Sequence, residues 1–139
     1  MLWDPIRRRY VTATPEEKVR QWWLRRMIDQ LGYPSGLLAV EKDLVSASLK
    51  TPTSNPNRRI DIICYTPDRK QGLVPLLIVE CKAHQCAAEN QVFGYNDVIQ
   101  APFVSIFLGE AAQTFWKEQG TLVSVPFLPA YAELTAKNG

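Results

Sequence analysis

The feature that most constrains the fold is a short apolar run that ends in two charges. Residues 76–79 are Leu-Leu-Ile-Val, and Glu80, Cys81 and Lys82 follow directly. A strand that is apolar on both faces is typical of the centre of a sheet, where other elements cover it on both sides. Because side chains alternate along a strand, Glu80 and Lys82 share one face and Cys81 faces the other. Burying an unpaired charge costs several kcal/mol, so these two charges need compensating partners.

The rest of the chain predicts the helices and strands that would surround this strand. Thr14 is suited to cap a helix and Pro15 to begin it, and Gly32 followed by Pro34 ends it. Strand patterns follow at residues 38–41, 60–65, 76–80, 103–108 and 121–125, and a helix pattern at 87–100. Residues 113–116 fit either a strand or a helix. This order predicts an α/β fold in which helices flank a mixed sheet.

The length of the chain favours a single domain over residues 1–139, with a core from about residue 12 to 125 and peripheral tails. Sixteen Lys and Arg nearly balance fourteen Asp and Glu, too mild an excess to indicate nucleic-acid binding by itself. The three cysteines lack paired spacing, and no apolar stretch has the length of a signal peptide or a membrane span. We therefore expect a cytoplasmic protein with reduced thiols and no membrane contact.

Arginine side chains gather in the first quarter of the chain and again before Asp61. They are Arg7, Arg8, Arg9, Arg20, Arg25 and Arg26, followed later by Arg58 and Arg59. A solvated basic helix face would explain the first group as well as a functional role would.

Asp61 interrupts an apolar strand upstream of Glu80. Residues 62–79 between them are enough for two strands and a turn at 67–72, so a hairpin would bring both carboxylates and Lys82 to one sheet edge. Two close carboxylates resist joint ionisation, whereas Mg²⁺ takes oxygen ligands and lets both stay charged. The backbone carbonyl of Cys81 is a candidate for a further ligand. Such a metal could polarise a phosphodiester and acidify a water that Lys82 orients.

These residues resemble the pattern of the PD-(D/E)XK nuclease superfamily. Asp61 matches its aspartate and residues 80–82 match its E-x-K motif, although Ile60 stands where the motif has proline. Gln91 and Tyr95 are similar to the Q-x-x-x-Y motif that follows E-x-K in nuclease domains of type I restriction R subunits and related recombination nucleases. Residues 14–21, 31–34 and 76–83 also resemble R-subunit-like domains, and the resemblance covers roughly residues 12–108.

The resemblance implies a restriction-endonuclease-like fold with an αβββαβ core, and it assigns roles at the centre of the site. Asp61, Glu80 and the Cys81 carbonyl would bind Mg²⁺, with Mn²⁺ as a substitute. Lys82 would assist catalysis.

The resemblance also implies roles for residues on two helices. Gln91 and Tyr95 would contact the DNA backbone or brace the catalytic residues. An additional acid on the first helix, which would join the catalytic residues, matches Glu17 or Glu16. The helical wheel places Glu16 in line with apolar positions and favours it, whereas alignment with the family favours Glu17.

We therefore expect a Mg²⁺-dependent nuclease that hydrolyses DNA phosphodiesters. The sequence has no G-x-x-x-x-G-K-[ST] phosphate loop, so a motor would be a separate partner. It has no helix-turn-helix or zinc finger either, so any sequence specificity would come from DNA structure, from a separate specificity protein or from an oligomer such as a homodimer. The alternatives are an inactive nucleic-acid- or partner-binding module on the same fold, and a nuclease for RNA or branched DNA.

In the simplest interpretation Glu80 and Lys82 form only an exposed ion pair. Cys81, His84 and Cys86 do not have the spacing of a zinc site.

Overall fold

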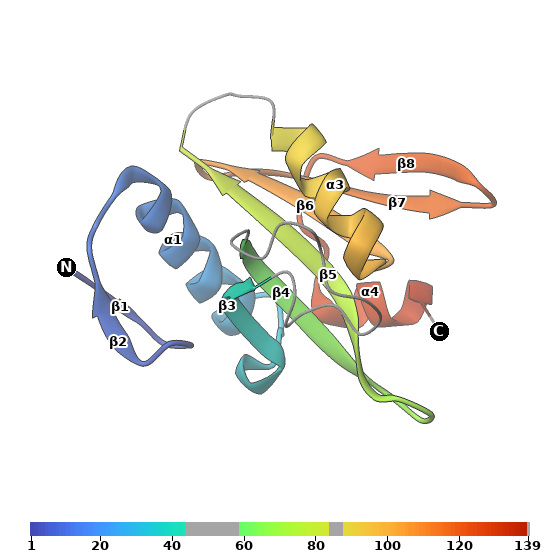
Figure 1. Ribbon diagram of the computed structural model, residues 1–139, viewed down its shortest axis with the longest axis horizontal. Coiled ribbons are helices and arrows are strands. Elements are labelled where there is room, and N and C mark those ends of the chain that lie inside the picture. Colours follow the sequence, from blue (N-terminus) through green and yellow to red (C-terminus); the bar gives the residue numbers. More distant parts are fainter. Residues whose placement is uncertain (44–58, 84–87, 139) are drawn as a thin grey trace.

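The computed structural model describes residues 1–43, 59–83 and 88–138, and its centre is a six-stranded mixed sheet (Figure 1). The strands lie in the order β3-β4-β5-β6-β7-β8. Their bounds are Leu38–Asp43, Arg59–Asp68, Gly72–Lys82, Phe103–Leu108, Ala111–Glu118 and Thr121–Val125. A separate hairpin of β1 (Leu2–Asp4) and β2 (Arg9–Val11) precedes the sheet. The predicted α/β class with a mixed sheet is confirmed, and residues 113–116 belong to a strand.

Among the described residues, α1 (Pro15–Asp29), α3 (Ala88–Ile99) and α4 (Tyr131–Asn138) accompany the sheet, with a short 3-10 helix η1 at Ser35–Leu37. The first helix begins as predicted, because the Thr14 hydroxyl accepts a hydrogen bond of 3.1 Å from the backbone N–H of Glu17. Beyond its end, Gly32 has a φ of 72°, which glycine adopts without strain. No helix in the described part of the chain is both long and apolar enough to cross a membrane.

β4 and β5 form the hairpin that the sequence predicts. The carboxylate of Asp68 accepts hydrogen bonds of 3.0 Å from the backbone N–H groups of Lys70 and Gln71, which closes the turn. β3 pairs antiparallel with β4, whereas β5 pairs parallel with β6, and α3 connects these two parallel strands. β5 therefore lies inside the sheet, with strands on both sides.

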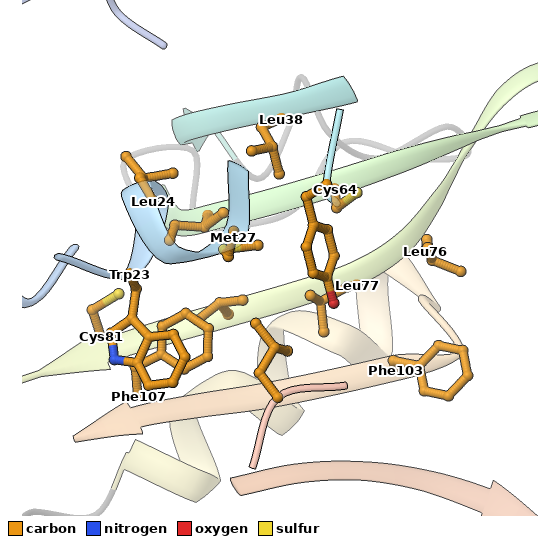
Figure 2. Packing of buried hydrophobic residues seen from close by; sticks show 14 of the residues in the cluster. Trp23, Leu24, Met27, Leu38, Cys64, Leu76, Leu77, Cys81, Phe103 and Phe107 are labelled. Atoms are coloured by element: carbon orange, nitrogen blue, oxygen red, sulfur yellow. The ribbon is translucent and has the colours of Figure 1, made fainter. Parts of the chain in front are cut away.

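Apolar side chains cover β5 on both of its faces, as expected for a central strand. On one face Trp23 and Met27 of α1 join a large core cluster in which the rings of Trp23 and Phe107 stack with centroids 4.1 Å apart (Figure 2). On the other face Ile78 packs with Tyr95 of α3 in a second cluster. The two helices therefore hold β5 from opposite sides.

Some residues outside the expected core of about 12–125 are also buried in the domain. Leu134 is fully buried and Leu128 is 4% exposed, and both belong to the cluster on the α1 side. The hydroxyl of Tyr33 donates to the carbonyl of Pro129 at 2.7 Å. At the other end of the chain, Asp4 is fully buried. The C-terminal segment and α1 therefore contribute to the same core cluster.

Candidate active site

Three neighbouring strands each place one carboxylate at the same level of the sheet. Asp61 and Glu80 are the positions next to the paired residues Ile62 and Val79 of β4 and β5. On the other side of β4, Glu41 and Asp61 lie between the paired positions Val40–Ile62 and Lys42–Ile60. The structure thus brings together the two acids that the sequence separates by a hairpin, and it adds a third that the sequence analysis did not identify.

Glu80 is a buried acid with one oxygen engaged. Its side chain is 4% exposed, and its Oε1 lies 3.2 Å from the Nζ of Lys82. Its Oε2 is buried and accepts no hydrogen bond from any described group. Burial, and after it the charge of Asp61, raise the pKa of Glu80 to about 8, although Lys82 acts in the opposite direction. Glu80 and Lys82 are therefore not the exposed ion pair of the simplest interpretation.

Asp61 is held from two sides. Its Oδ1 accepts a hydrogen bond of 2.7 Å from Nη2 of Arg20, and its Oδ2 accepts one of 2.7 Å from the backbone N–H of Cys81. The first bond is charge-assisted and reaches α1, and the second fixes the carboxylate against β5. Over the described ranges, no group of three or more His, Cys, Asp or Glu side chains is placed to hold a metal ion. A cation bound by Asp61 and Glu80 would need backbone carbonyls, water or phosphate as its other ligands.

The inward acid of α1 is Glu17. Its residue surface is 8% exposed, whereas Glu16 is exposed to solvent. The expectation of Glu16 from the helical wheel is wrong about orientation, because the buried stripe runs through Glu17, Arg20 and Leu24. Both carboxylate oxygens of Glu17 are engaged, one by Arg7 and the other by Arg20.

The site also contains three residues to which the sequence analysis gave no role in it, namely Arg7, Arg20 and Glu41. Burial lowers the pKa of Arg20, but its hydrogen bond to Asp61 and the charges of Asp61 and Glu17 outweigh this, so the pKa is raised. Its position one turn after Glu17 is a local signal that could have identified it. Arg7 and Glu41 are in contact although they are 34 residues apart, and no local pattern joins them.

Tyr95 lies in the core beneath α3. It is 4% exposed and belongs to the cluster that includes residues of β4 and β5. This burial suits a residue that braces the strands carrying the site better than one that contacts a DNA backbone. The described part of the structure does not include the side chain of Gln91, nor residues His84 and Cys86.

The thiol of Cys81 faces the core on the α1 side, near Trp23, as the alternation of the strand predicts (Figure 2). The residue is fully buried, and burial raises the pKa of its thiol well above the ordinary value. A thiol that stays protonated is a poor metal ligand. Only the backbone of Cys81 reaches the site, through its N–H to Asp61.

The charges of this site do not balance. In the described part of the chain, contacts and strand register connect the acids Asp4, Glu17, Glu41, Asp61 and Glu80 with the cations Arg7, Arg20 and Lys82. With all of these acids ionised, an excess of about two negative charges remains, which is the charge that one divalent cation neutralises. The buried Oε2 of Glu80 is an oxygen that such a cation could engage.

Comparisons with known proteins agree with each other. The family model for the type I restriction enzyme R protein N terminus matches residues 15–129. Among solved structures, a fragment described as an HsdR subunit of a type I restriction enzyme from Vibrio vulnificus YJ016 is similar, with a TM-score of 0.61 and 15% sequence identity. The similarity covers 92% of this chain and 26% of that chain, so this chain spans about a quarter of its neighbour's length. At this identity the likeness shows a shared fold alone. No curated protein sequence matches.

Proposed function

Because this chain belongs to the family of the type I restriction enzyme R protein N terminus, we propose that it is a Mg²⁺-dependent nuclease that hydrolyses DNA phosphodiester bonds. Membership of a restriction-enzyme family supports a nuclease-related role. The proposal goes further, because it names the cation, the substrate and the residues that act, and it places the chain in the PD-(D/E)XK superfamily.

The observation that carries this proposal is the buried carboxylate of Glu80 next to Asp61 and Lys82. Burial without a cation raises the pKa of Glu80 to about 8, so a bound cation would favour the ionised form at neutral pH. No described group forms a hydrogen bond with the buried Oε2 of Glu80, and this fits a cation ligand better than a group kept only for stability. A perturbed acid beside specific charge partners is typical of a functional site.

Each residue has a role that its position supports. Asp61 and Glu80 would hold the cation, and the carbonyl of Cys81 is the proposed third protein ligand. When bound, Mg²⁺ would supply a Lewis acid for the phosphodiester and acidify a water. Lys82 is 20% exposed at its side chain, so its ammonium can approach a phosphate while it stays 3.2 Å from Glu80. There it would stabilise the negative charge that develops on the phosphate.

The order of elements supports the finer fold assignment. Along the chain, α1 is followed by β3, β4 and β5, and then by α3 and β6. This is the order of the αβββαβ core that restriction-endonuclease-like folds have. We propose that Tyr95 braces β4 and β5 from α3, and that Gln91 lies on the same helix near the site.

The motor and specificity functions are proposed to reside outside residues 1–139. The chain spans about a quarter of the HsdR fragment to which it is similar. A separate motor or specificity protein, or a second copy of this chain, would then supply what one such site lacks, namely a cut in the second strand or a choice of sequence.

A second candidate function is an inactive nucleic-acid- or partner-binding module on the same fold. One observation favours it, because both oxygens of Asp61 already accept hydrogen bonds, from Arg20 and from the Cys81 backbone. The intact set of Asp61, Glu80 and Lys82 favours the nuclease. Cleavage of RNA or of branched DNA would be a variant of the same chemistry.

The test is a cleavage assay on the whole chain with Mg²⁺ or Mn²⁺, using plasmid, linear, branched and single-stranded DNA as well as RNA. Wild type is compared with Lys82→Ala and with Lys70→Ala, which removes an exposed lysine from the β4–β5 turn. We expect cleavage by wild type and Lys70→Ala, and a loss of at least about 100-fold in Lys82→Ala.

The outcomes separate the candidates. Cation-dependent cleavage that disappears in folded Lys82→Ala supports the nuclease, and the preferred nucleic acid identifies the substrate. Nucleic-acid binding that needs no cation, with no cleavage on any substrate, favours the inactive module.

A further inference from the structure

Two arginines and two glutamates form a closed ring beside Asp61. Arg7 binds one oxygen of Glu17, and Arg20 binds the other. Nη1 of Arg7 lies 3.1 Å from Oε2 of Glu41, and Nη2 of Arg20 lies 3.5 Å from Oε1 of the same residue. Within each glutamate, one oxygen therefore faces Arg7 and the other faces Arg20, and the charges alternate in sign around the ring.

The ring has one contact toward the N-terminal hairpin and one toward the candidate active site. Nε of Arg7 donates to Oδ2 of Asp4 at 2.7 Å, and Asp4 is fully buried at the end of β1. Nη2 of Arg20 donates to Oδ1 of Asp61 at 2.7 Å. A continuous path of charged contacts therefore joins the hairpin, α1, β3 and β4.

The ring is largely removed from water. The side chains of Arg20, Glu17 and Arg7 are 5%, 10% and 13% exposed, and that of Glu41 is 35% exposed. Low exposure strengthens each charged contact and makes an unpaired member costly, so the members fix one another's orientation. A guanidinium also presents its N–H groups in a rigid planar fork, which suits it to hold several carboxylates in one geometry.

Glu41 is held in an unusual backbone conformation. Its φ is 53°, in the left-handed region that a glutamate rarely adopts, although it lies within the span of β3. Such strain persists where the surrounding contacts over-determine a residue, and it is concentrated at functional sites. The two arginine contacts of Glu41 are contacts of this kind.

We propose that Arg20 is a positioning residue that orients Asp61 for cation binding, and that Arg7 acts through the ring to hold Arg20. The inference rests on the proposed function, because it assumes that Asp61 binds a divalent cation. Glu17 then acts through Arg20 rather than as a cation ligand, since both of its oxygens are engaged within the ring.

A positioning residue and a simple counter-charge predict opposite changes in cation affinity when the residue is removed. Removing a positive charge near the site should strengthen cation binding, because the repulsion between like charges disappears. Removing a positioning group should weaken cation binding, because partners that orient a ligand typically contribute about 10- to 100-fold in metal affinity. The same substitution therefore distinguishes the two roles.

The experiment measures the affinity of the whole chain for Mn²⁺ by titration calorimetry, with DNA cleavage as a second readout. Arg20→Met, Arg20→Lys and Arg7→Met are compared with wild type. Arg25→Met is the matched control on α1, and Arg9→Met is the matched control on the hairpin, because both side chains are exposed. We expect binding about 10-fold weaker in both Arg20 variants, a smaller loss in Arg7→Met and no change in the controls.

Thermal melts without Mn²⁺ identify any variant that does not fold. Arg20→Lys keeps the charge without the planar fork, and Arg7→Met leaves Arg20 in place. If Arg20→Met fails to fold, the Mn²⁺ affinities of these two variants test the positioning role. Unchanged or tighter Mn²⁺ binding in these folded variants overturns the positioning role. Wild type that binds no Mn²⁺ and cleaves no DNA contradicts the proposed function itself, so the two failures are distinguishable.

Discussion

Replacing Glu80 with glutamine should make the cation-free protein more stable at alkaline pH. Burial and the charge of Asp61 raise the pKa of this side chain to about 8 in the folded protein, from an ordinary value of 4.5. Between these two values the folded state holds a proton that the unfolded state has released. The free energy of unfolding of the wild type therefore falls as the pH rises through this window, and it levels off above the folded pKa.

The size of the effect follows from the width of the window. Each pH unit in which the folded state binds one more proton corresponds to about 1.4 kcal/mol. From pH 5.5 to 8 this amounts to a loss of about 3 kcal/mol attributable to Glu80. Glutamine does not ionise, so Glu80→Gln should match the wild type near pH 5.5 and exceed its stability by about 3 kcal/mol at pH 8.5.

Urea unfolding in EDTA, at pH values from 5.5 to 8.5, measures this difference. Glu110→Gln, which removes an exposed carboxylate, is the control and should follow the wild type at every pH. Parallel pH profiles for wild type and Glu80→Gln would refute the reasoning, because they would show that Glu80 does not bind its proton more tightly in the folded protein.

Two further predictions concern Asp61 and the C-terminal segment. Asp61→Asn should lower the pKa of Glu80, because the charge of Asp61 is one cause that raises it. A carbon-detected NMR titration of labelled glutamate measures this pKa. An unchanged pKa of Glu80 in Asp61→Asn would show that the charge of Asp61 does not act on Glu80. Leu134→Ala should reduce the free energy of unfolding by about 3 kcal/mol, because a fully buried leucine leaves a cavity in the core. Chemical unfolding measures this change, and a decrease in the free energy of unfolding below about 1 kcal/mol would show that the C-terminal segment contributes little to the core.

The sequence predicted the parts of the fold that follow from local patterns. Apolar runs, a capping threonine and turn residues gave the positions of α1, α3 and five strands of the sheet. The pattern of β7 fitted a strand or a helix equally, and the short strands β1 and β2 were not predicted. The hairpin between Asp61 and Glu80 could also be predicted, because a turn lies between two strands of matching length. The C-terminal segment could not, because α4 has only eight residues and follows two prolines, and its burial depends on long-range contacts in the core cluster of α1.

The candidate site was predictable where its residues lie on adjacent strands, and unpredictable where they come from distant segments. Asp61 and Glu80 meet because of strand pairing. The contact between Arg7 and Glu41 depends on the packing of the N-terminal hairpin against α1, and nothing in either local sequence indicates it. The choice between Glu16 and Glu17 depended on where the buried stripe of α1 is centred. The helical wheel relied on Val19, Trp23 and Met27, and it did not count the buried Arg20 and Leu24, which lie nearer to Glu17.

Uptake of Mg²⁺ at pH 7 tests whether Asp61 and Glu80 together bind a divalent cation. With a pKa of about 8 in the cation-free protein, Glu80 is mostly protonated at pH 7, and it must lose its proton to become a ligand. Calorimetric titration with Mg²⁺, in two buffers of different ionisation enthalpy, counts the protons released. We predict the release of about one proton by wild type and of none by Glu80→Gln. The absence of Mg²⁺ binding, or binding with no release of protons by the wild type, would contradict the claim.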